Sequence, residues 1–204
     1  MTAGPARARA VLDHLCVDPA ADALDPVAVY GRNAPLGLEI GFGMGQALLD
    51  WAERSPDWNL LGLEIYTPGL GALLLGVADR KLENVRAIEA PAEIVLNRHL
   101  GALWLDEVRI FFPDPWPKAR HHKRRLIQTP FVALLADRLR PGGVLWLATD
   151  WAPYADWMRS VMAAEPRFEP LSGSDVPGDR VETRFEARGL RLGHAIEDLR
   201  YRRV

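Results

Sequence analysis

The chain has 204 residues, of which 49% are hydrophobic and 25% charged, a composition that suits one globular domain with a sizeable core. Its formal net charge is −2, so affinity for a polyanion must come from local clusters of arginine and lysine. A single cysteine, Cys16, excludes an intrachain disulfide framework and a cysteine-cluster metal site, and no apolar run approaches the length of a membrane span. We therefore expect a cytoplasmic protein.

The N-terminal part of the chain shows little regular pattern. Its first ten residues carry two arginines but lack the apolar core of a signal peptide. The stretch 19–35 is interrupted by Pro26 and Gly31, which favours irregular structure. We interpret residues 1–35 as a lead-in and predict one domain over residues 36–204.

From residue 36 onward, short apolar runs alternate with segments in which apolar residues recur at helical spacing. This alternation predicts an α/β fold with a parallel sheet covered by helices on both faces. Thr67 and Pro68 are expected to be the N-cap and first residue of one helix, and the Pro141-Gly142-Gly143 run is expected to end another. The predicted strands are 36–40, 59–65, 85–90, 107–112 and 144–149, and the predicted helices are 47–55, 69–80, 92–100, 129–140 and 154–164.

Ligands of such folds bind beyond the carboxyl ends of the strands, near the point where the strand order switches. Residues at these ends are therefore candidates for a site. Each carboxylate among them also has a simpler interpretation, as a cap of the helix that follows. The candidates are Glu39 to Gly45, Glu64, Ala90 with Pro91, Asp114, and Asp150.

The first predicted strand continues into Gly41-Phe42-Gly43-Met44-Gly45, which allows a tight turn and a close approach of the backbone to a ligand. Gln46 stands where a dinucleotide-binding fingerprint has its third glycine, and no P-loop lysine follows, so a phosphate-binding loop is not indicated. Glu64, at the end of the second strand, is placed to accept hydrogen bonds from the ribose hydroxyls of an adenosine ligand. This combination indicates S-adenosylmethionine.

The segment 109–125 joins a buried-strand pattern to a rigid turn and a basic run. Prolines at 113, 115 and 117 make the chain leave the sheet and hold Asp114 at the strand end. Trp116 offers a flat face for a base, with core packing as a near-equal alternative. Dense positive charge beside an aromatic ring favours a nucleic acid, although the segment alone would also suit a solvated loop. The cationic residues are Lys118, Arg120, Lys123, Arg124 and Arg125, with His121 and His122 between them.

Four motifs in this order resemble the bacterial tRNA (guanine-N7)-methyltransferases, the TrmB family. Together they cover the chain from about Leu36 to the C-terminus and are far more specific than a glycine turn alone. The motifs are LEIGFGMG at 38–45, FPDPWPK at 112–118, ATD at 148–150 and TRFEARG at 183–189.

The resemblance implies a class I methyltransferase domain over residues 36–204. Its fold is α/β, Rossmann-like and doubly wound, with a mostly parallel seven-stranded sheet and helices on both faces. The implied methyl donor is S-adenosylmethionine, with no metal. The implied donor-binding residues are Glu39, Gly41, Gly43, Gly45, Glu64, Pro91 and Asp114.

The implied reaction is methyl transfer to N7 of a guanine in the tRNA variable loop, with Asp114 as the catalytic carboxylate. Residues 120–125 are then expected to meet RNA. The residues implied near the guanine are Lys118, Asp150, Thr183, Arg184, Phe185 and Glu186. The last four also suit a plain helix start with Phe185 buried. We expect tRNA as the partner, a monomer or homodimer without an obligate protein partner, and no membrane association.

Guanine N7 carries an available lone pair, so its attack on a sulfonium methyl needs neither a general base nor a metal. A protein can add the positioning of the two reactants and a negative charge that opposes the cation growing on the purine. Asp114 can supply both by accepting a hydrogen bond from the guanine N–H edge. Asp150 can share this role or cap the helix beyond it.

Two features depart from the family's pattern. Pro91 stands where the family commonly has Asp or Asn for the adenine amino group, so adenine recognition would use backbone groups or Glu89. The N-terminus is shorter and less basic than in many members. Other hypotheses are an RNA-binding protein with a degenerate donor site, a methyltransferase for another RNA base or a protein side chain, and, least supported, an NAD-dependent oxidoreductase.

Overall fold

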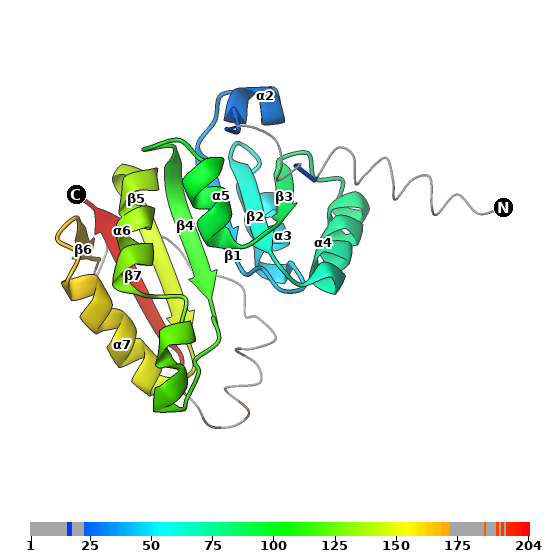
Figure 1. Ribbon diagram of the computed structural model, residues 1–204. Helices are drawn as coiled ribbons and strands as arrows, with labels where there is room; N and C mark the ends of the chain where they lie inside the picture. The colour runs from blue at the N-terminus through cyan, green and yellow to red at the C-terminus, as the bar shows by residue number, and fades with distance from the viewer. Residues whose placement is uncertain (1–15, 18–22, 172–185, 187–190, 192, 194) are drawn as a thin grey trace. The chain divides into compact units, whose positions relative to one another are not determined.

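The computed structural model describes residues 16–17, 23–171, 186, 191, 193 and 195–204. The chain divides into two compact units, residues 1–101 and 102–204. Their helices and strands are labelled in Figure 1. The predicted alternation of strands and helices is confirmed in both units. In the described ranges, no helix is both long and apolar enough to cross a membrane.

The first unit is built on three parallel strands in the order β3-β2-β1. Every residue of β1 is buried, as expected for a parallel strand that is covered on both faces. The strands are β1 (Leu36–Ile40), β2 (Asn59–Glu64) and β3 (Val85–Glu89), and the helices that follow them are α3 (Gln46–Arg54), α4 (Thr67–Arg80) and α5 (Ala92–Arg98).

Helices α3 and α4 pack against β2 and form one hydrophobic cluster with the strands. Leu48 from α3, Leu60 from β2 and Leu73 from α4 are each 0% exposed. Full burial of a side chain of this size stabilises a fold by roughly 1.5–3 kcal/mol. The cluster therefore fixes the strand ends from which the turns of this unit emerge.

The lead-in contains a helix, so the expectation of irregular structure over 19–35 is wrong for residues 26–30. Helix α2 spans Pro26–Tyr30, with Asp25 as its N-cap and Gly31 in the left-handed region at φ 70° as its C-cap. The Asp25 carboxylate accepts from the Val27 amide at 2.9 Å. These are ordinary capping signals, and the prolines and glycine that suggested irregularity mark the helix ends.

Side-chain hydrogen bonds from Tyr30 and Arg32 help to attach helix α2 and the residues after it to the first unit. The Tyr30 hydroxyl donates to the Leu60 carbonyl at 2.7 Å. The Arg32 guanidinium donates to the Asn59 side chain at 2.8 Å and to the Trp58 carbonyl at 2.6 Å. Burial raises the pKa of Tyr30, so this hydroxyl remains a donor at physiological pH.

The second unit has four strands in the order β4-β5-β7-β6. Strands β4 and β5 are parallel, whereas β7 pairs antiparallel with both of its neighbours. Strands β6 and β7 have no counterpart among the predicted elements, because charged residues interrupt the apolar pattern of β7. The elements are β4 (Leu105–Phe111), the 3₁₀ helix η1 (Ala119–Arg124), α6 (Thr129–Arg138), β5 (Leu139–Thr149), α7 (Ala152–Ala163), β6 (Phe168–Pro170) and β7 (Glu197–Arg203).

Strand β5 begins five residues earlier than predicted, and α6 ends at Arg138 rather than at the Pro-Gly-Gly run. The pairing with β4 shifts register between the pairs Leu105–Leu139 and Glu107–Val144. Gly142 lies at φ 85° within this shift. The Pro-Gly-Gly run therefore forms an irregularity inside a strand. The same residues commonly end a helix, and their spacing in the sequence does not distinguish the two structures.

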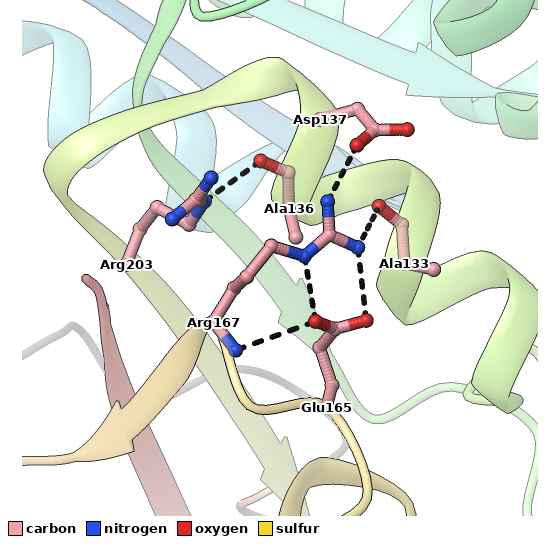
Figure 2. Close-up of polar contacts among 6 residues, drawn as sticks. All are labelled: Ala133, Ala136, Asp137, Glu165, Arg167 and Arg203. Atoms are coloured by element: carbon pink, nitrogen blue, oxygen red, sulfur yellow. Dashed lines mark hydrogen bonds and ion pairs between the residues drawn. The ribbon is translucent and has the colours of Figure 1, made fainter.

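An ion-pair cluster joins the turn after α7 to helix α6 (Figure 2). The Arg167 guanidinium contacts the Glu165 carboxylate through two nitrogens, at 2.6 and 2.9 Å, and Asp137 through a third contact at 2.6 Å. The same guanidinium donates to the Ala133 carbonyl at 3.2 Å. Arg203 of β7 donates to the Ala136 carbonyl at 2.9 Å, so strand, helix and turn are held together.

Candidate functional site

The glycine turn, residues 41–45, follows β1 and has the backbone conformation that its sequence predicts. Gly41, Gly43 and Gly45 have φ values of 75°, 55° and 82°, a region that side-chain-bearing residues rarely adopt. The Gly41 amide donates to the Leu63 carbonyl at 2.8 Å, which holds the turn beside the end of β2. A Cβ atom added to Gly41 would meet no atom within 4 Å, so this face of the turn is open to a ligand.

Glu64 closes the glycine turn from the end of β2. Its Oε2 atom accepts from the Gly43 amide at 2.7 Å. Its Oε1 atom accepts from the amides of Ile65 at 2.7 Å and Tyr66 at 3.1 Å. A carboxylate offers about four lone-pair sites, so roughly one remains on Oε2 for a ribose hydroxyl. Glu64 therefore shapes the turn and keeps capacity for a ligand.

The start of helix α4 adds contacts by Gly69 and Thr67 that the sequence did not predict. A Cβ atom on Gly69 would lie 2.1 Å from the Gly43 carbonyl oxygen, so only glycine allows this approach to the turn. Thr67 is the first residue of α4 rather than its N-cap, which is Tyr66. The Thr67 hydroxyl donates instead to the Glu89 carboxylate at 2.5 Å. The Thr-Pro-Gly sequence signals a helix start, and only the packing shows these contacts.

Three further candidates from the first unit lie at or near strand ends. Glu39 is inside β1 and only 2% exposed, so it is a buried carboxylate just before the turn. Pro91 is the exposed N-cap of α5 and makes no side-chain capping bond. Glu89 is exposed and pairs in register with Glu64. Pro91 has no N–H donor and no polar side chain, so adenine recognition through backbone groups or Glu89 stays a prediction.

The residues of the first unit fit an adenosine-type methyl donor. The turn is open at Gly41, and its carboxylate partner Glu64 keeps an acceptor site. Apolar side chains lie within the turn and directly after Glu64 in the sequence. Of these, Met44 is 44%, Ile65 70% and Tyr66 57% exposed, which suits contact with a flat purine. In the described part of the chain, no group of three His, Cys, Asp or Glu side chains is placed to hold a metal ion.

In the second unit, the proline elbow, residues 112–118, follows β4. Phe112 and Trp116 have φ values of 53° and 43°, unusual for residues with large side chains. The Phe112 amide donates to the Ala148 carbonyl at 2.8 Å, which ties the elbow to the neighbouring strand β5. Asp114 lies midway between the two strained residues and is exposed. The elbow therefore presents one carboxylate to solvent on a restrained backbone.

The basic run after the elbow forms η1, whose N-cap is Lys118. The Arg124 guanidinium lies 5.0 Å from the centroid of the Trp116 ring, and the His121 ring meets the same indole edge-on at 5.7 Å. Trp116 is thus partly covered by its own chain rather than left fully open for a base. The exposed cations of the run are Lys118, Arg120, Lys123 and Arg124, and His121 and His122 are half-buried.

Arg125 does not share the exposed position of its neighbours. Arg125 is only 4% exposed, and its Nε donates to the Pro115 carbonyl at 2.9 Å. Its guanidinium carbon lies 4.9 Å from the ring centroid of Tyr154 and 5.3 Å from that of Trp157. The side chain of Arg125 is therefore directed into the protein, a position that does not favour the predicted contact with RNA. Nothing in the residue pattern distinguishes this arginine from the others in the run.

Asp150 directly follows β5 and is half-buried, two residues before the start of α7. The N-cap position of α7 is occupied by Trp151 and not by Asp150. Glu186 is half-buried. Thr183, Arg184 and Phe185 lie outside the described residues.

The chain matches the family model Methyltransf_4, described as "Putative methyltransferase", over residues 33–199. A tRNA (guanine-N(7)-)-methyltransferase of Thiobacillus denitrificans is 51% identical over 182 residues, which cover 88% of this chain and 80% of the relative. One of Pseudomonas putida is 46% identical over 209 residues, which cover 100% of this chain and 87% of the relative. This chain belongs to the tRNA (guanine-N7)-methyltransferase family. The resemblance seen in the sequence motifs is thereby confirmed.

Solved structures of more distant methyltransferases share the fold. The 16S rRNA methyltransferase KamB aligns with a TM-score of 0.61 at 16% identity, covering 90% of this chain and 96% of that one. An S-adenosylmethionine-dependent O-methyltransferase of Thermotoga maritima aligns with a TM-score of 0.57 at 12% identity, covering 100% of this chain and 67% of that one. At these identities the likeness establishes the fold alone. The predicted α/β, Rossmann-like class I methyltransferase fold is confirmed.

Proposed function

We propose that this chain transfers the methyl group of S-adenosylmethionine to N7 of a guanine in the variable loop of tRNA. The observation that carries the proposal is the match, over the whole chain, to relatives named tRNA (guanine-N(7)-)-methyltransferase. The two described turns support it, since one is open beside an acceptor carboxylate and the other exposes Asp114 next to a basic run. The cytoplasm is the proposed location, because tRNA is the proposed partner.

The donor would be held by residues of the first unit. Gly41 leaves one face of the turn open, Gly43 allows the turn its positive φ, and Glu64 accepts from a ribose hydroxyl with its remaining lone pair. When bound, S-adenosylmethionine supplies a methyl group on a positively charged sulfur. Glu39, Gly45 and Pro91 complete the proposed set, with Glu39 as a buried carboxylate and Pro91 as an exposed boundary after β3.

The guanine would be held by residues of the second unit. Its N7 lone pair forms the bond to the methyl carbon while the carbon–sulfur bond breaks and its electron pair stays on sulfur. Asp114 accepts a hydrogen bond from the guanine N–H edge, which orients the ring and opposes the positive charge that grows on it. Asp150, Lys118 and residues 183–186 are proposed to complete the guanine site, with Asp114 also bordering the donor.

The exposed cations around η1 are proposed to bind tRNA phosphates. Lys118, Arg120, Lys123 and Arg124 lie within seven residues and face solvent, so they can replace counterions on the RNA backbone. His121 and His122 are half-buried beside them and can donate to phosphate as neutral or charged rings. Sequence-independent contacts of this kind supply affinity, whereas the guanine site decides which base is methylated.

The test is incubation with a labelled methyl donor and unmodified tRNA, followed by nucleoside analysis. We expect 7-methylguanosine as the product. A matched transcript with adenine at the variable-loop guanine should accept no label. Label in a different nucleoside would assign another base as substrate, and label in protein would assign a side chain. Correct folding without donor binding by calorimetry would instead favour the RNA-binding hypothesis that Pro91 motivates.

A further inference from the structure

The elbow that carries Asp114 is strained on both sides. Phe112 lies two residues before Asp114 and Trp116 two residues after, with φ values of 53° and 43°. Aromatic residues disfavour this left-handed region, and strained backbone persists only where surrounding contacts over-determine it. Such positions cluster at functional sites. The contacts that hold the elbow therefore decide how Asp114 is presented.

On each side of the elbow, a hydrogen bond joins the backbone to a distant part of the second unit. Before Asp114, the Phe112 amide donates to the Ala148 carbonyl of β5 at 2.8 Å. After it, the carbonyl of Pro115 accepts from Nε of Arg125 at 2.9 Å. Pro115 has no N–H, so its carbonyl is the backbone group by which the residue after Asp114 can be fixed.

The guanidinium of Arg125 is itself held against helix α7. It lies 4.9 Å from the Tyr154 ring centroid and 5.3 Å from that of Trp157. Both rings are tied to Ile127, whose amide donates to the Tyr154 hydroxyl at 3.2 Å and whose carbonyl accepts from Trp157 Nε1 at 2.7 Å. A planar cation against two fixed rings keeps its Nε–H in one direction.

The environment also preserves the protonation states that these contacts need. Burial raises the pKa of Tyr154 to about 12, so its hydroxyl stays neutral at physiological pH. Burial lowers the pKa of Arg125, but an arginine remains charged in proteins. Tyr154 is 0% exposed and Arg125 4%, so water has little access to these two side chains.

We propose that Arg125 is a positioning residue that sets the direction of Asp114 by fixing the Pro115 carbonyl against helix α7. The inference rests on the proposed methyl transfer to guanine. Helix α7 begins at Ala152, two residues after Asp150. The same contact therefore ties the elbow with Asp114 to the element that follows Asp150, the other carboxylate proposed to meet the guanine.

The experiment compares Arg125→Met with Arg125→Lys in single-turnover methylation at saturating donor and tRNA. Formation of 7-methylguanosine by the parent protein is required first and tests the proposed function separately. We expect the rate to fall about 10- to 100-fold in Arg125→Met, because small displacements of a reacting group cost rates of this order. Arg125→Lys should restore little of the single-turnover rate. A lysine ammonium group is not planar, so it cannot stack on the rings and hold one N–H in a fixed direction.

Binding measurements separate this role from a phosphate contact. If Arg125 only positions Asp114, tRNA affinity and its salt dependence should match those of the parent protein in both Arg125 variants. Arg124→Met, at the exposed neighbour, should lower the salt slope by about one. Donor affinity, measured by calorimetry, should change little in all three variants, because the proposed donor contacts apart from Asp114 belong to the first unit.

Two further variants keep the test decisive if Arg125→Met folds poorly. Trp157→Leu removes one stacking face and should slow single turnover by roughly 3- to 10-fold, less than the loss of the guanidinium itself. Arg167→Met removes a structural arginine in the same unit, so it should lower the melting temperature without changing the rate. Full rescue by Arg125→Lys, or a reduced salt slope with an unchanged rate, would overturn the proposal in favour of a phosphate contact.

Discussion

The glycine turn after β1 and the proline elbow after β4 both lie at the carboxyl end of a parallel strand, and both contain residues with positive φ. In the turn, Gly41, Gly43 and Gly45 adopt that conformation. In the elbow, Phe112 and Trp116 adopt it, at a cost of roughly 1–2 kcal/mol each. The turn is therefore relaxed by its own composition, whereas the elbow depends on contacts from elsewhere in its unit.

This difference suits the two proposed tasks. A relaxed glycine turn brings bare backbone close to a ligand and needs only Glu64 to close it. An elbow that holds one carboxylate in a fixed direction needs contacts that restrain its backbone. Here the hydrogen bonds with Ala148 and Arg125 provide them. Binding a donor requires access, and opposing a developing charge requires preorganisation.

Asp114→Asn tests whether the elbow acts through charge as well as shape, and it has the largest expected effect. The amide preserves size but loses the negative charge that opposes the cation forming on guanine. We expect the single-turnover rate to fall roughly 10²–10³-fold, by analogy with the loss of one oxyanion-hole donor, with the sign of the charge reversed. A rate within a few-fold of the parent protein would leave Asp114 as part of a structural turn.

Combined neutralisation of Arg120, Lys123 and Arg124 separates the outer basic run from the buried Arg125. We expect tRNA affinity to fall and its salt slope to decrease by up to about three, since each lost phosphate contact removes roughly one. Donor affinity should barely change. Salt titrations of tRNA binding provide the measurement, and unchanged affinity with an unchanged slope would place the RNA path elsewhere on the protein.

Gly45→Ala would impose on the glycine turn the kind of strain that the elbow carries. Gly45 has φ 82°, and a Cβ there would lie 2.8 Å from Leu73 Cδ1. We expect donor affinity to fall about 10-fold, from a strain of roughly 1–2 kcal/mol. Gly31→Ala is the matched control, because Gly31 has φ 70° with no atom within 4 Å of an added Cβ. Calorimetry should show equal donor affinity in Gly31→Ala and the parent protein. Equal losses of donor affinity in both variants would show that the glycine turn is not part of the donor site.

Glu165→Gln tests an ion pair that has a structural role and lies outside the proposed site. Its expected effect is the smallest of the four. The hydrogen bond from Arg167 lowers the pKa of Glu165 below its ordinary value of 4.5. The pair therefore adds stability above pH 4.5, and this stability is lost as pH falls through the lowered folded-state pKa. We expect a loss of about 1 kcal/mol at pH 7 and a shallower decline of the melting temperature below pH 4.5. An acid profile identical to that of the parent would show that the pair contributes nothing to folding.

Much of the fold could be predicted from local pattern, because apolar periodicity reports which residues face a core. Strand β1 has the predicted bounds, and α3, α4, α5 and α7 differ from prediction by a few residues at their ends. Helix α2 was missed although Asp25 and Gly31 are ordinary capping residues, since the prolines near them also suit a loop. The end of α6 was misplaced because Pro-Gly-Gly breaks a helix and bends a strand equally well.

The sequence by itself determined the glycine turn, the carboxylate at Glu64 and the prolines around Asp114, because each follows from residue type at a strand end. Only the tertiary structure decided which arginine of the basic run is buried. Arg124 and Arg125 are adjacent and chemically identical, yet the first is exposed and the second is held by Pro115, Tyr154 and Trp157. Spacing along the chain cannot separate them, because the two rings that select Arg125 lie about thirty residues away and reach it only through packing of α7.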